Sequence, residues 1–563
     1  MQSADGRFAL VFNGEIYNYR ELRANLIESG VRFKSDSDTE VLLAAWQAWG
    51  RDCLARLDGM FAFTVYDRES QTLTCVRDAF GIKPFFYSYG DGDFCFASEV
   101  PGLIALRGSK PQVNMQRAYD YLVHGEYDAR ADSMVDGIRH LLPGHVLTVS
   151  MGGAATEVVL ERWWAPRIAQ SFDMGFSEAT ELVRQRFFRS VELNLRSDVA
   201  LGAALSGGID SSAIVCAMRH LAPEMPIHTF SFVASGTPAD EERWIDIVNS
   251  HVRATVHKVR LGPGELMRDL DGLLLAQGEP FGSLSIYAQY RVYQEARERG
   301  VTVTLDGQGA DEILAGYQGF PGERVHSLID EREWLQAYRF LDQWRRWPGR
   351  SLSTGLRSVI SEWGGDAVLV MLRRLAGLDR PPEWIDAEMV AEMGIHFKFQ
   401  RFRSGAEASG RRLIAQEVNM LTSHGLPALL RHGDRNSMHF AVESRVPFLS
   451  LDFVELMLGM PERFLVSDEG RTKHLFRAAM EGIVPAEILN RKDKIGFEPP
   501  EKDLILSIAK DIKQVLRQDI GIPFLRGKVL SQHFDEIVTG VRPFSWQAWR
   551  WFNFYKWKLM LVG

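Results

Sequence analysis

The sequence predicts two domains of different fold class, a mostly β N-terminal region and an α/β C-terminal region that continues into helices. Short apolar runs separated by turn residues fill residues 8–160. From residue 176 onward, short apolar strands alternate with helical patterns, which is typical of a parallel sheet covered on both faces. Beyond residue 316 the pattern is almost wholly helical. A chain of 563 residues also exceeds the size of one ordinary domain.

Composition and charge exclude several classes of function. With 46% hydrophobic and 25% charged residues, the chain has the profile of a soluble globular protein. Its net charge of −8 argues against a general nucleic-acid binder, although a local basic groove stays possible. No apolar run is long enough for a membrane span, and the first ten residues do not form a signal peptide.

The cysteine count predicts a reduced protein of the cytoplasm. Four cysteines in this length are too few for a disulfide scaffold, and none has the CxxC spacing of a zinc knuckle. We expect Cys53, Cys75, Cys95 and Cys216 to be ordinary core or surface thiols.

In the N-terminal region we expect strands and two amphipathic helices. One helix is expected near residues 19–27, and a second follows Ser37, whose spacing to Glu40 is that of a capping box. An apolar run at residues 8–12 is interpreted as ending at the turn pair Asn13-Gly14. Further strands are expected at residues 61–66, 72–76, 94–97, 145–150 and 157–160, the last two as a hairpin.

In the C-terminal region a long helix is expected first, at residues 176–195. The strands that follow are expected at residues 200–205, 227–233, 255–261 and 301–305, and the helices between them at 209–219, 241–252 and 285–299. The aromatic stretch at residues 546–557 is interpreted as a packed helix.

The strongest local signal is the run Leu205-Ser206-Gly207-Gly208-Ile209-Asp210-Ser211-Ser212, which follows a strand and opens a helix. Its two glycines allow a tight turn and a close backbone approach to an anion. The positive end of the following helix then faces that anion, and three serines add hydroxyl donors. No lysine follows the glycines, so this is not the GxxxxGK[ST] phosphate loop. The run resembles the SGGxDS loop of the ATP-pyrophosphatases, which grips the pyrophosphate of ATP.

A second group of carboxylates follows the strand expected at residues 301–305. It contains Asp306, Gly307, Gln308 and Asp311. Open α/β sheets bind ligands at the carboxyl ends of their strands, so Asp210 and Asp311 can meet there. Their oxygen ligands suit Mg²⁺. Taken alone, Asp306 and Asp311 are explained as well by capping of the next helix.

With both loops present, the chain resembles the glutamine-dependent asparagine synthetases over essentially its whole length. The C-terminal matches are Asp434-Arg435-Asn436-Ser437-Met438, Glu443-Ser444-Arg445-Val446-Pro447-Phe448-Leu449 and Arg491-Lys492-Asp493-Lys494-Ile495-Gly496-Phe497. The N-terminal matches are Asn13-Gly14-Glu15-Ile16-Tyr17-Asn18, Ser37-Asp38-Thr39-Glu40, Arg77-Asp78-Ala79-Phe80-Gly81-Ile82-Lys83-Pro84 and Phe96-Ala97-Ser98-Glu99.

The resemblance implies a fold, cofactors and site residues. It implies a glutamine amidotransferase domain at residues 1–160, with the stacked β-sheets of N-terminal-nucleophile hydrolases, and a synthetase domain of the ATP-pyrophosphatase type at 170–563. The implied cofactors are ATP and Mg²⁺. Glutamine-binding positions fall on Asn13, Gly14, Glu15 and Asp38. ATP-contact positions fall on Leu205, Ser206, Gly207, Gly208, Asp210, Ser211, Ser212, Phe232, Asp306 and Gly307. The metal ligands would be Asp210 and Asp311, and Lys494 would stabilise charge during amide formation.

Three departures from the family pattern affect this interpretation. Gln308 stands where many asparagine synthetases carry a glutamate that can act as a base, and glutamine cannot take a proton at neutral pH. Glu279 stands where relatives often have aspartate. Met1 cannot replace the N-terminal cysteine nucleophile of the family. We expect a misplaced or truncated start that lacks the nucleophile segment; the alternative is a variant that uses free ammonia.

The leading interpretation is an ATP-dependent ligase that converts aspartate to asparagine through a β-aspartyl-AMP intermediate. Glutamine or ammonia supplies the nitrogen, and AMP and pyrophosphate are the other products. An alternative keeps the adenylation and changes the acceptor to another carboxylate, such as a sugar uronic acid in polysaccharide biosynthesis. A third alternative is an inactive scaffold. Partners are expected to be small molecules, with neither nucleic acid nor membrane, and the assembly is expected to be a homodimer.

Overall fold

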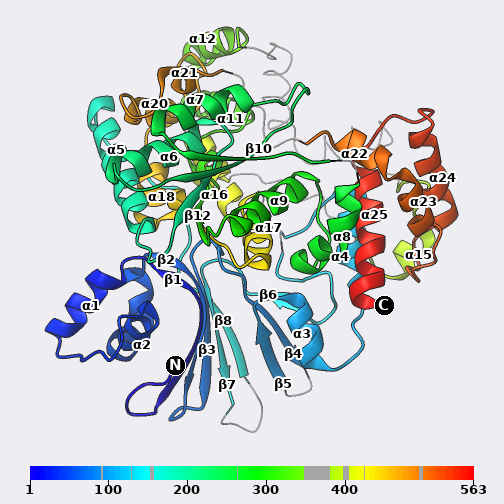
Figure 1. Ribbon diagram of the computed structural model, residues 1–563, viewed down its shortest axis with the longest axis horizontal. Coiled ribbons are helices and arrows are strands. Elements are labelled where there is room, and N and C mark those ends of the chain that lie inside the picture. The colour runs from blue at the N-terminus through cyan, green and yellow to red at the C-terminus, as the bar shows by residue number, and fades with distance from the viewer. Residues whose placement is uncertain are drawn as a thin grey trace.

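The computed structural model describes residues 1–90, 93–128, 130–151, 157–262, 264–347, 381–396, 405–423, 425–492 and 499–563. Figure 1 shows two parts, an N-terminal part with antiparallel sheets and a larger part that contains a parallel sheet and most of the helices. Across the described residues, no helix is both long and apolar enough to cross a bilayer.

The N-terminal part contains two antiparallel sheets. The first has the order β1-β2-β3-β7-β8, with bounds Phe8–Ile16, Gly59–Asp67, Thr72–Arg77, His145–Ser150 and Glu157–Arg162. The second has the order β5-β4-β6, with bounds Asp93–Ala97, Phe86–Gly90 and Arg139–His140. The helices of this part are α1 (Tyr19–Glu28), α2 (Asp38–Trp49), α3 (Val100–Arg107) and α4 (Met115–Tyr119).

The alternation of side chains along the first sheet produces two hydrophobic cores. On β2, Phe61, Phe63 and Val65 face α1 and α2, where they pack with the buried leucines and valines of both helices. Ala62 on β2 and Cys75 on β3 face the other way and pack with Tyr87 of the second sheet. Because successive residues of a strand point to opposite faces, one strand serves both cores. The helices and the two sheets therefore form stacked layers, as the resemblance implied.

Strand β1 is longer than the sequence indicated. The Asn13-Gly14 pair was expected to end the strand, but the pairing with β2 continues through Gly14↔Phe61 to Ile16↔Gly59. Gly14 has a φ of +148°, and a Cβ there would lie 2.0 Å from the carbonyl oxygen of Met60. Glycine is required at this position by the close approach of the neighbouring strand and not by a turn.

The larger part is built on a five-stranded sheet in which every pair is parallel. Its order is β11-β10-β9-β12-β13, with bounds Thr255–Val259, His228–Phe232, Leu201–Ala204, Val303–Leu305 and Glu443–Arg445. One face packs against α5 (Phe176–Asn194), α6 (Ile209–Leu221) and α7 (Glu242–Val252). The other face packs against α9 (Ser285–Glu298).

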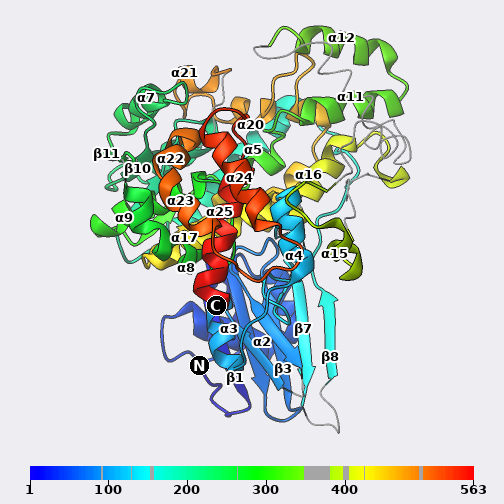
Figure 2. The same cartoon turned by 90° about the vertical axis from the view of Figure 1, so that its right-hand side faces the viewer.

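Helices make up most of the rest of the described chain. They are α8 (Glu265–Gln277), α10 (Ala310–Ile313), α11 (Phe320–Asp330), α12 (Trp334–Trp344), α15 (Ala387–Glu392), α16 (Arg412–Thr422), α17 (Leu426–His439), α18 (Leu451–Leu458), α19 (Glu462–Leu465), α20 (His474–Ala479), α21 (Ala486–Leu489), α22 (Glu501–Ser507), α23 (Ala509–Leu516), α24 (Gly527–Val538) and α25 (Gln547–Trp557). Figure 2 shows α25 running down toward α3, which lies below the C-terminus. Trp549 of α25 and Leu103 of α3 belong to one hydrophobic core, so the aromatic C-terminal stretch is a packed helix, as expected.

The predicted fold class is confirmed in both parts: antiparallel layered sheets in the first, and a parallel sheet with helices on both faces in the second. Strands β4, β6 and β13 and helices α3, α4 and α8 were not predicted.

Candidate functional site

A cavity of about 760 Å³ lies where the strand order of the parallel sheet reverses. From β9 the chain adds β10 and β11 on one side of the sheet and later returns to place β12 on the other side. The loops after β9 and β12 both line this cavity. A crevice at the carboxyl ends of strands, at such a reversal, is where open α/β sheets bind ligands.

The loop between β9 and α6 is held by its own hydroxyl groups. The backbone N–H of Ser206 donates to Ser211 Oγ at 3.1 Å, and Ser211 Oγ donates to the carbonyl of Gly208 at 3.3 Å. Gly207 has a φ of +74°, and a Cβ there would lie 2.7 Å from Trp244 Cβ. The loop is thereby folded against α7, and the N-terminus of α6 is directed at the cavity, where it favours an anion.

The loop after β12 is anchored to the neighbouring strand. The backbone N–H of Asp306 donates to the carbonyl of Arg445 at 2.8 Å. Tyr293 of α9 donates from its hydroxyl to Asp306 Oδ2 at 3.2 Å and also contacts Ser444 Oγ at 2.9 Å. Burial raises the pKa of Asp306 above its usual value, although the hydrogen bond from Tyr293 opposes this. Gln308, the departure from the family pattern, lies on the cavity wall.

Asp210 and Asp311 meet in this cavity, where they share one cation. The ammonium of Lys473 lies 2.6 Å from Asp210 Oδ2 and 2.7 Å from Asp311 Oδ1. Two carboxylates that converge on one positive charge are the hard oxygen donors that Mg²⁺ prefers, so the donor set fits a divalent cation.

Further positive charges line the same wall of the cavity. They come from Arg471, Arg477, Arg491 and Lys492. Burial lowers the pKa of Arg477 to about 10, and the nearby charge of Arg471 contributes. Arg491 pairs with Glu241 and also donates to the carbonyl of Gly207 at 3.2 Å, which ties this wall to the glycine loop. The cavity therefore combines a helix N-terminus with several cations, as a polyphosphate requires.

Most of the expected ATP-site residues come together around this cavity. Leu205, Ser206, Gly208, Asp210, Ser211, Asp306, Gly307, Gln308 and Asp311 line it. Three others are not among its lining residues: Gly207 supports the loop from behind, Ser212 is fully buried in α6, and Phe232 is buried in the core beneath α9. Lys494 lies outside the described residues.

Sequence reasoning missed the residues that the chain supplies from a distance. Lys473 and Arg477 lie more than 260 residues beyond Asp210, in a stretch whose charges resemble those of an ordinary surface. Tyr293, Gln289 and His432 come from the faces of α9 and α17 that turn toward the cavity. The only sequence signal was the Lys473–Arg477 spacing of four, which places two cations on one side of a helical turn.

A second cavity, about 520 Å³, lies between the two parts of the molecule. The four expected glutamine-binding residues, Asn13, Gly14, Glu15 and Asp38, all line it. The Asp38 carboxylate accepts a hydrogen bond from the Ile16 N–H at 3.0 Å, which joins the start of α2 to the end of β1. The larger part contributes Glu443 and Arg445 to the same cavity.

The carboxylates of this second cavity lie close enough to raise one another's pKa. Burial, followed by the charges of Glu443 and Asp38, raises the pKa of Glu15 to about 7. Burial also raises the pKa of Asp38. Such a set favours a cationic ligand, because an ammonium group would relieve the repulsion between the carboxylates. An amino-acid α-ammonium group fits this requirement.

None of the four cysteines lies among the described residues that line the second cavity. Cys53, Cys75 and Cys216 are buried, and burial raises the pKa of each thiol to about 12. A thiol of that kind is inert as a nucleophile. Cys95 is half-buried on β5.

Strand β13 is shared by the two cavities. Glu443 and Arg445 line the second cavity, whereas Ser444, between them, contacts Tyr293 on the wall of the first. This follows from the two-residue repeat of a strand, which turns neighbouring side chains to opposite faces.

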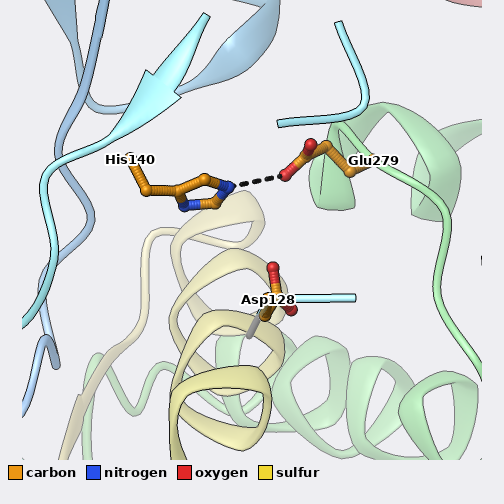
Figure 3. Close-up of side chains that lie close together, drawn as sticks. All are labelled: Asp128, His140 and Glu279. Atoms are coloured by element: carbon orange, nitrogen blue, oxygen red, sulfur yellow. Dashed lines mark ion pairs between the residues drawn. The ribbon is translucent and has the colours of Figure 1, made fainter. Parts of the chain in front are cut away.

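A charged cluster joins the two parts of the molecule near the second sheet. Figure 3 shows Asp128, His140 and Glu279 directed toward one another, with His140 Nε2 3.3 Å from Glu279 Oε2. Their ligand atoms lie within 4.8 Å of one another, as in many metal sites. Arg431, however, donates from Nε to Asp128 Oδ2 at 2.7 Å and lies 3.7 Å from Glu279 Oε2. A guanidinium therefore already supplies the positive charge, and we interpret the cluster as a structural contact.

Comparison with sequence profiles assigns both parts. The asparagine synthase profile matches residues 182–559, and the profile of a glutamine amidotransferase domain matches residues 1–164.

Individual relatives extend this likeness over most of the chain. The chain is 30% identical over 501 residues to asparagine synthetase [glutamine-hydrolyzing] 3 of Bacillus subtilis (strain 168). The matched region covers 86% of this chain and 74% of that protein. It is 29% identical over 515 residues to asparagine synthetase [glutamine-hydrolyzing] 1 of the same organism, with 88% and 76% covered. A putative asparagine synthetase [glutamine-hydrolyzing] of Mycobacterium bovis is 30% identical over 528 residues, with 88% and 76% covered.

Proposed function

Since the chain belongs to the asparagine synthase family, we propose that it forms asparagine from aspartate, ATP and ammonia, with release of AMP and pyrophosphate. The observation that carries this proposal is the first cavity, in which a helix N-terminus, two convergent carboxylates and a wall of cations surround one space. That combination suits the transfer of an adenylyl group from a nucleoside triphosphate.

In the first step an oxygen of the substrate carboxylate attacks the α-phosphorus of ATP. The bond from the α-phosphorus to the bridging oxygen breaks, and pyrophosphate leaves. The departing negative charge would be met by the N-terminal end of α6, which lines the cavity, and by Arg471, Arg477 and Arg491. Asp210 and Asp311 would hold Mg²⁺, which neutralises phosphate charge when bound.

In the second step ammonia attacks the acyl carbon of the adenylate. A C–N bond forms, the bond to the AMP oxygen breaks, and the nitrogen loses a proton to solvent or to a phosphate oxygen. Gln308 lies on the cavity wall, where its amide can orient the substrate by hydrogen bonding but cannot accept that proton. Lys494 would stabilise the oxygen that becomes negative during the attack; this role rests on the resemblance alone.

The second cavity is proposed to bind glutamine, with its α-ammonium group beside Glu15 and Asp38 and with Asn13 and Gly14 near the amide. Hydrolysis of that amide needs a nucleophile, which none of the four cysteines of this chain supplies at the cavity. We therefore propose that the chain of this sequence uses ammonium as its nitrogen source.

A larger carboxylate acceptor remains the second candidate. The first cavity is in the upper part of the volume range of small-molecule sites, and Tyr317, Trp344 and Trp347 line it. These rings could contact an acceptor larger than aspartate.

One assay tests the proposal and separates its alternatives. Purified protein is supplied with MgATP and ammonium, and pyrophosphate release is measured with aspartate and with a panel of uronic acids. Release with aspartate, together with asparagine in the products, is the expected result. Release with a uronic acid alone would favour the second candidate, and no release with any carboxylate would contradict both.

The nitrogen source is tested in the same assay by replacing ammonium with glutamine. The expected result is no glutamate and no amide product, and glutamate release by the pure protein would contradict the ammonium-only proposal. Asp210→Asn should abolish pyrophosphate release while the protein still folds, because this carboxylate lies on the cavity wall and Asp311 still pairs with Lys473.

A further inference from the structure

Lys473 occupies an unusual position for a lysine. Its side chain is only 3% exposed, and its ammonium lies 2.5 Å from Asp210 Oδ1, 2.6 Å from Asp210 Oδ2 and 2.7 Å from Asp311 Oδ1. Its backbone φ is +55°, a left-handed conformation that costs free energy for any residue with a Cβ. Strained backbone of this kind persists where the surrounding structure requires it, and it concentrates at functional sites.

The space around this ammonium is created by a glycine. A Cβ at Gly316 would lie 1.9 Å from Asp311 Oδ1 and 2.5 Å from Lys473 Cε. The φ of Gly316 is not in the left-handed region, so the backbone conformation does not require glycine there. The glycine is required by the carboxylate and lysine that pack against it.

Lys473 and a divalent cation would bring different charges to this pair of carboxylates. Asp210 and Asp311 carry two negative charges, and Lys473 supplies one positive charge. A divalent cation would neutralise both carboxylates, and the ammonium would then be free to pair with another anion. The neighbouring Arg471 and Arg477 line the same cavity, so the ammonium would join an existing group of cations that face the proposed triphosphate.

We propose that Lys473 is the resident counter-ion of the metal site and that it exchanges places with Mg²⁺ when the nucleotide binds. This inference rests on the proposed use of MgATP. Without nucleotide, the ammonium holds Asp210 and Asp311 together and competes with metal ions. With nucleotide, the metal takes the two carboxylates and the ammonium moves to the phosphates.

The first test measures metal binding without nucleotide. Mn²⁺ replaces Mg²⁺ as the probe, and free Mn²⁺ is counted by electron paramagnetic resonance during a titration of the full chain. Lys473→Met should raise the Mn²⁺ affinity about tenfold or more, because the net negative charge of the ligand set rises when its competing cation is removed. The double variant Lys473→Met with Asp210→Asn should lose this gain.

A matched control is available where the edge strand β11 meets α7. Lys258 also bridges two carboxylates, those of Glu242 and Asp246, at 2.9 and 2.6 Å, but it does not line either cavity. Lys258→Met makes the same change of charge in a comparable ion triad and should leave Mn²⁺ binding as in the wild type. An equal gain in both variants would mean a general charge effect and would overturn the proposal.

The second test measures the other half of the exchange. The affinity for ATP at saturating Mn²⁺, where the metal has taken the two carboxylates, should fall about tenfold or more in Lys473→Met, since one charged contact to the phosphates is lost. Unchanged or weaker Mn²⁺ binding by a folded Lys473→Met variant would overturn the inference, and so would unchanged ATP affinity. Failure of the wild type to release pyrophosphate would instead contradict the proposed function and leave the Mn²⁺ result interpretable. If Lys473→Met does not fold, Lys473→Gln replaces it, with the same expected results.

Discussion

At Gly316, the absence of a single side-chain atom determines the geometry of the proposed ATP site. Its missing side chain leaves room for the Asp311 carboxylate and the Lys473 side chain. The cavity thus depends on a residue that takes no part in chemistry itself.

Gly316→Ala should therefore disrupt the site with little effect on the fold. The new methyl group must displace either the carboxylate or the lysine, and the loss of one such electrostatic contact typically costs about 10²–10³ in rate. Pyrophosphate release under saturating MgATP and ammonium measures the effect. Gly319→Ala is the control, because a Cβ there meets nothing within 4 Å. Equal rates in the two variants would contradict the prediction.

Gln308 tests whether the site needs a base at this position. If positioning and charge neutralisation are sufficient, Gln308→Glu should retain or improve turnover with ammonium, since the added carboxylate can accept a proton. Steady-state kinetics with aspartate check this. Loss of activity would indicate that the acceptor is not aspartate.

Glu15 makes a prediction about pH. Its pKa is raised to about 7 by burial and by the charges of Glu443 and Asp38. The ionised form is the one that attracts an ammonium group, so glutamine should bind more tightly as the pH rises through about 7. Removal of the Glu443 charge lowers the pKa of Glu15, so Glu443→Gln should move the midpoint to lower pH. Calorimetric titration of glutamine between pH 5.5 and pH 8.5, roughly 1.5 units on either side of the midpoint, measures this. A pH-independent affinity would contradict it.

At the scale of elements, the two adjacent glycines of the loop between β9 and α6 have different structural roles. Gly207 has a positive φ and lies against Trp244 and Ile245 of α7, whereas Gly208 has a φ of −74° and ordinary space around it. The first is needed for the packing of the loop on α7, whereas the second lines the proposed ATP site.

Gly207→Ala should therefore lower stability more than Gly208→Ala. The left-handed conformation alone costs about 1–2 kcal/mol for alanine. The Cβ would also lie 3.0 Å from the backbone nitrogen of Ile245, which cannot move as a side chain can. Denaturant unfolding compares the two variants. ATP affinity should fall in Gly207→Ala as well, because the loop would move away from α7.

These elements also mark what the sequence could and could not predict. The apolar strands β9, β10 and β12 and the glycine loop were predicted because their pattern is local. Strand β13, with the polar sequence Glu-Ser-Arg, has no apolar signal; its pairing with β12 comes from tertiary structure, with Leu305 opposite Arg445. Strand β6, with two polar residues, has no apolar signal either. Helix α8 and strand β4 do carry apolar residues in a local pattern, and these were overlooked.

The residues of the candidate site also divide into those that the sequence predicted and those that it did not. Asp210 and Asp311 were predicted as partners because each follows a strand of one sheet, and they do share a cation. The identity of that cation was not predictable. Lys473 lies 263 residues from Asp210, and nothing in the sequence around it indicates that it is buried or which residues it contacts. Such long-range pairs are set by the packing of α20 and not by any local pattern.

At the scale of the whole molecule, the contact between the two parts contains a buried ion pair. Lys83, from the loop after β3, donates to Asp434 Oδ1 of α17 at 2.9 Å, and both side chains are about 5% exposed or less. Arg435 also contacts the Asp434 carboxylate. Burial would raise the pKa of Asp434, but the charges of Lys83 and Arg435 lower it below its usual value.

Lys83→Met should destabilise the full chain by about 3 kcal/mol, since a buried carboxylate then loses one of its two cations. Lys513→Met, which breaks a surface pair with Asp535, is the control and should cost about 1 kcal/mol or less. Guanidinium unfolding of both variants provides the measurement. Equal unfolding midpoints would contradict the prediction.

The pH dependence of that pair has a definite sign. The folded-state pKa of Asp434 lies below its unfolded value, so its stabilising contribution is present at neutral pH and is lost as the pH falls through the folded pKa. The difference in stability between the wild type and Lys83→Met should therefore shrink in acid.

Strand β13 places a constraint on how this chain can change its length. Glu443 and Arg445 face one cavity and Ser444 faces the wall of the other, with only three residues in the strand. A single residue inserted or deleted between Val442 and Val446 would exchange the two faces, because the side chains of a strand alternate. The second cavity would then lose the charged side chains of Glu443 and Arg445, and the wall of the first would lose the Ser444 hydroxyl. This stretch can accept substitutions one at a time, but its number of residues is fixed by the two cavities together.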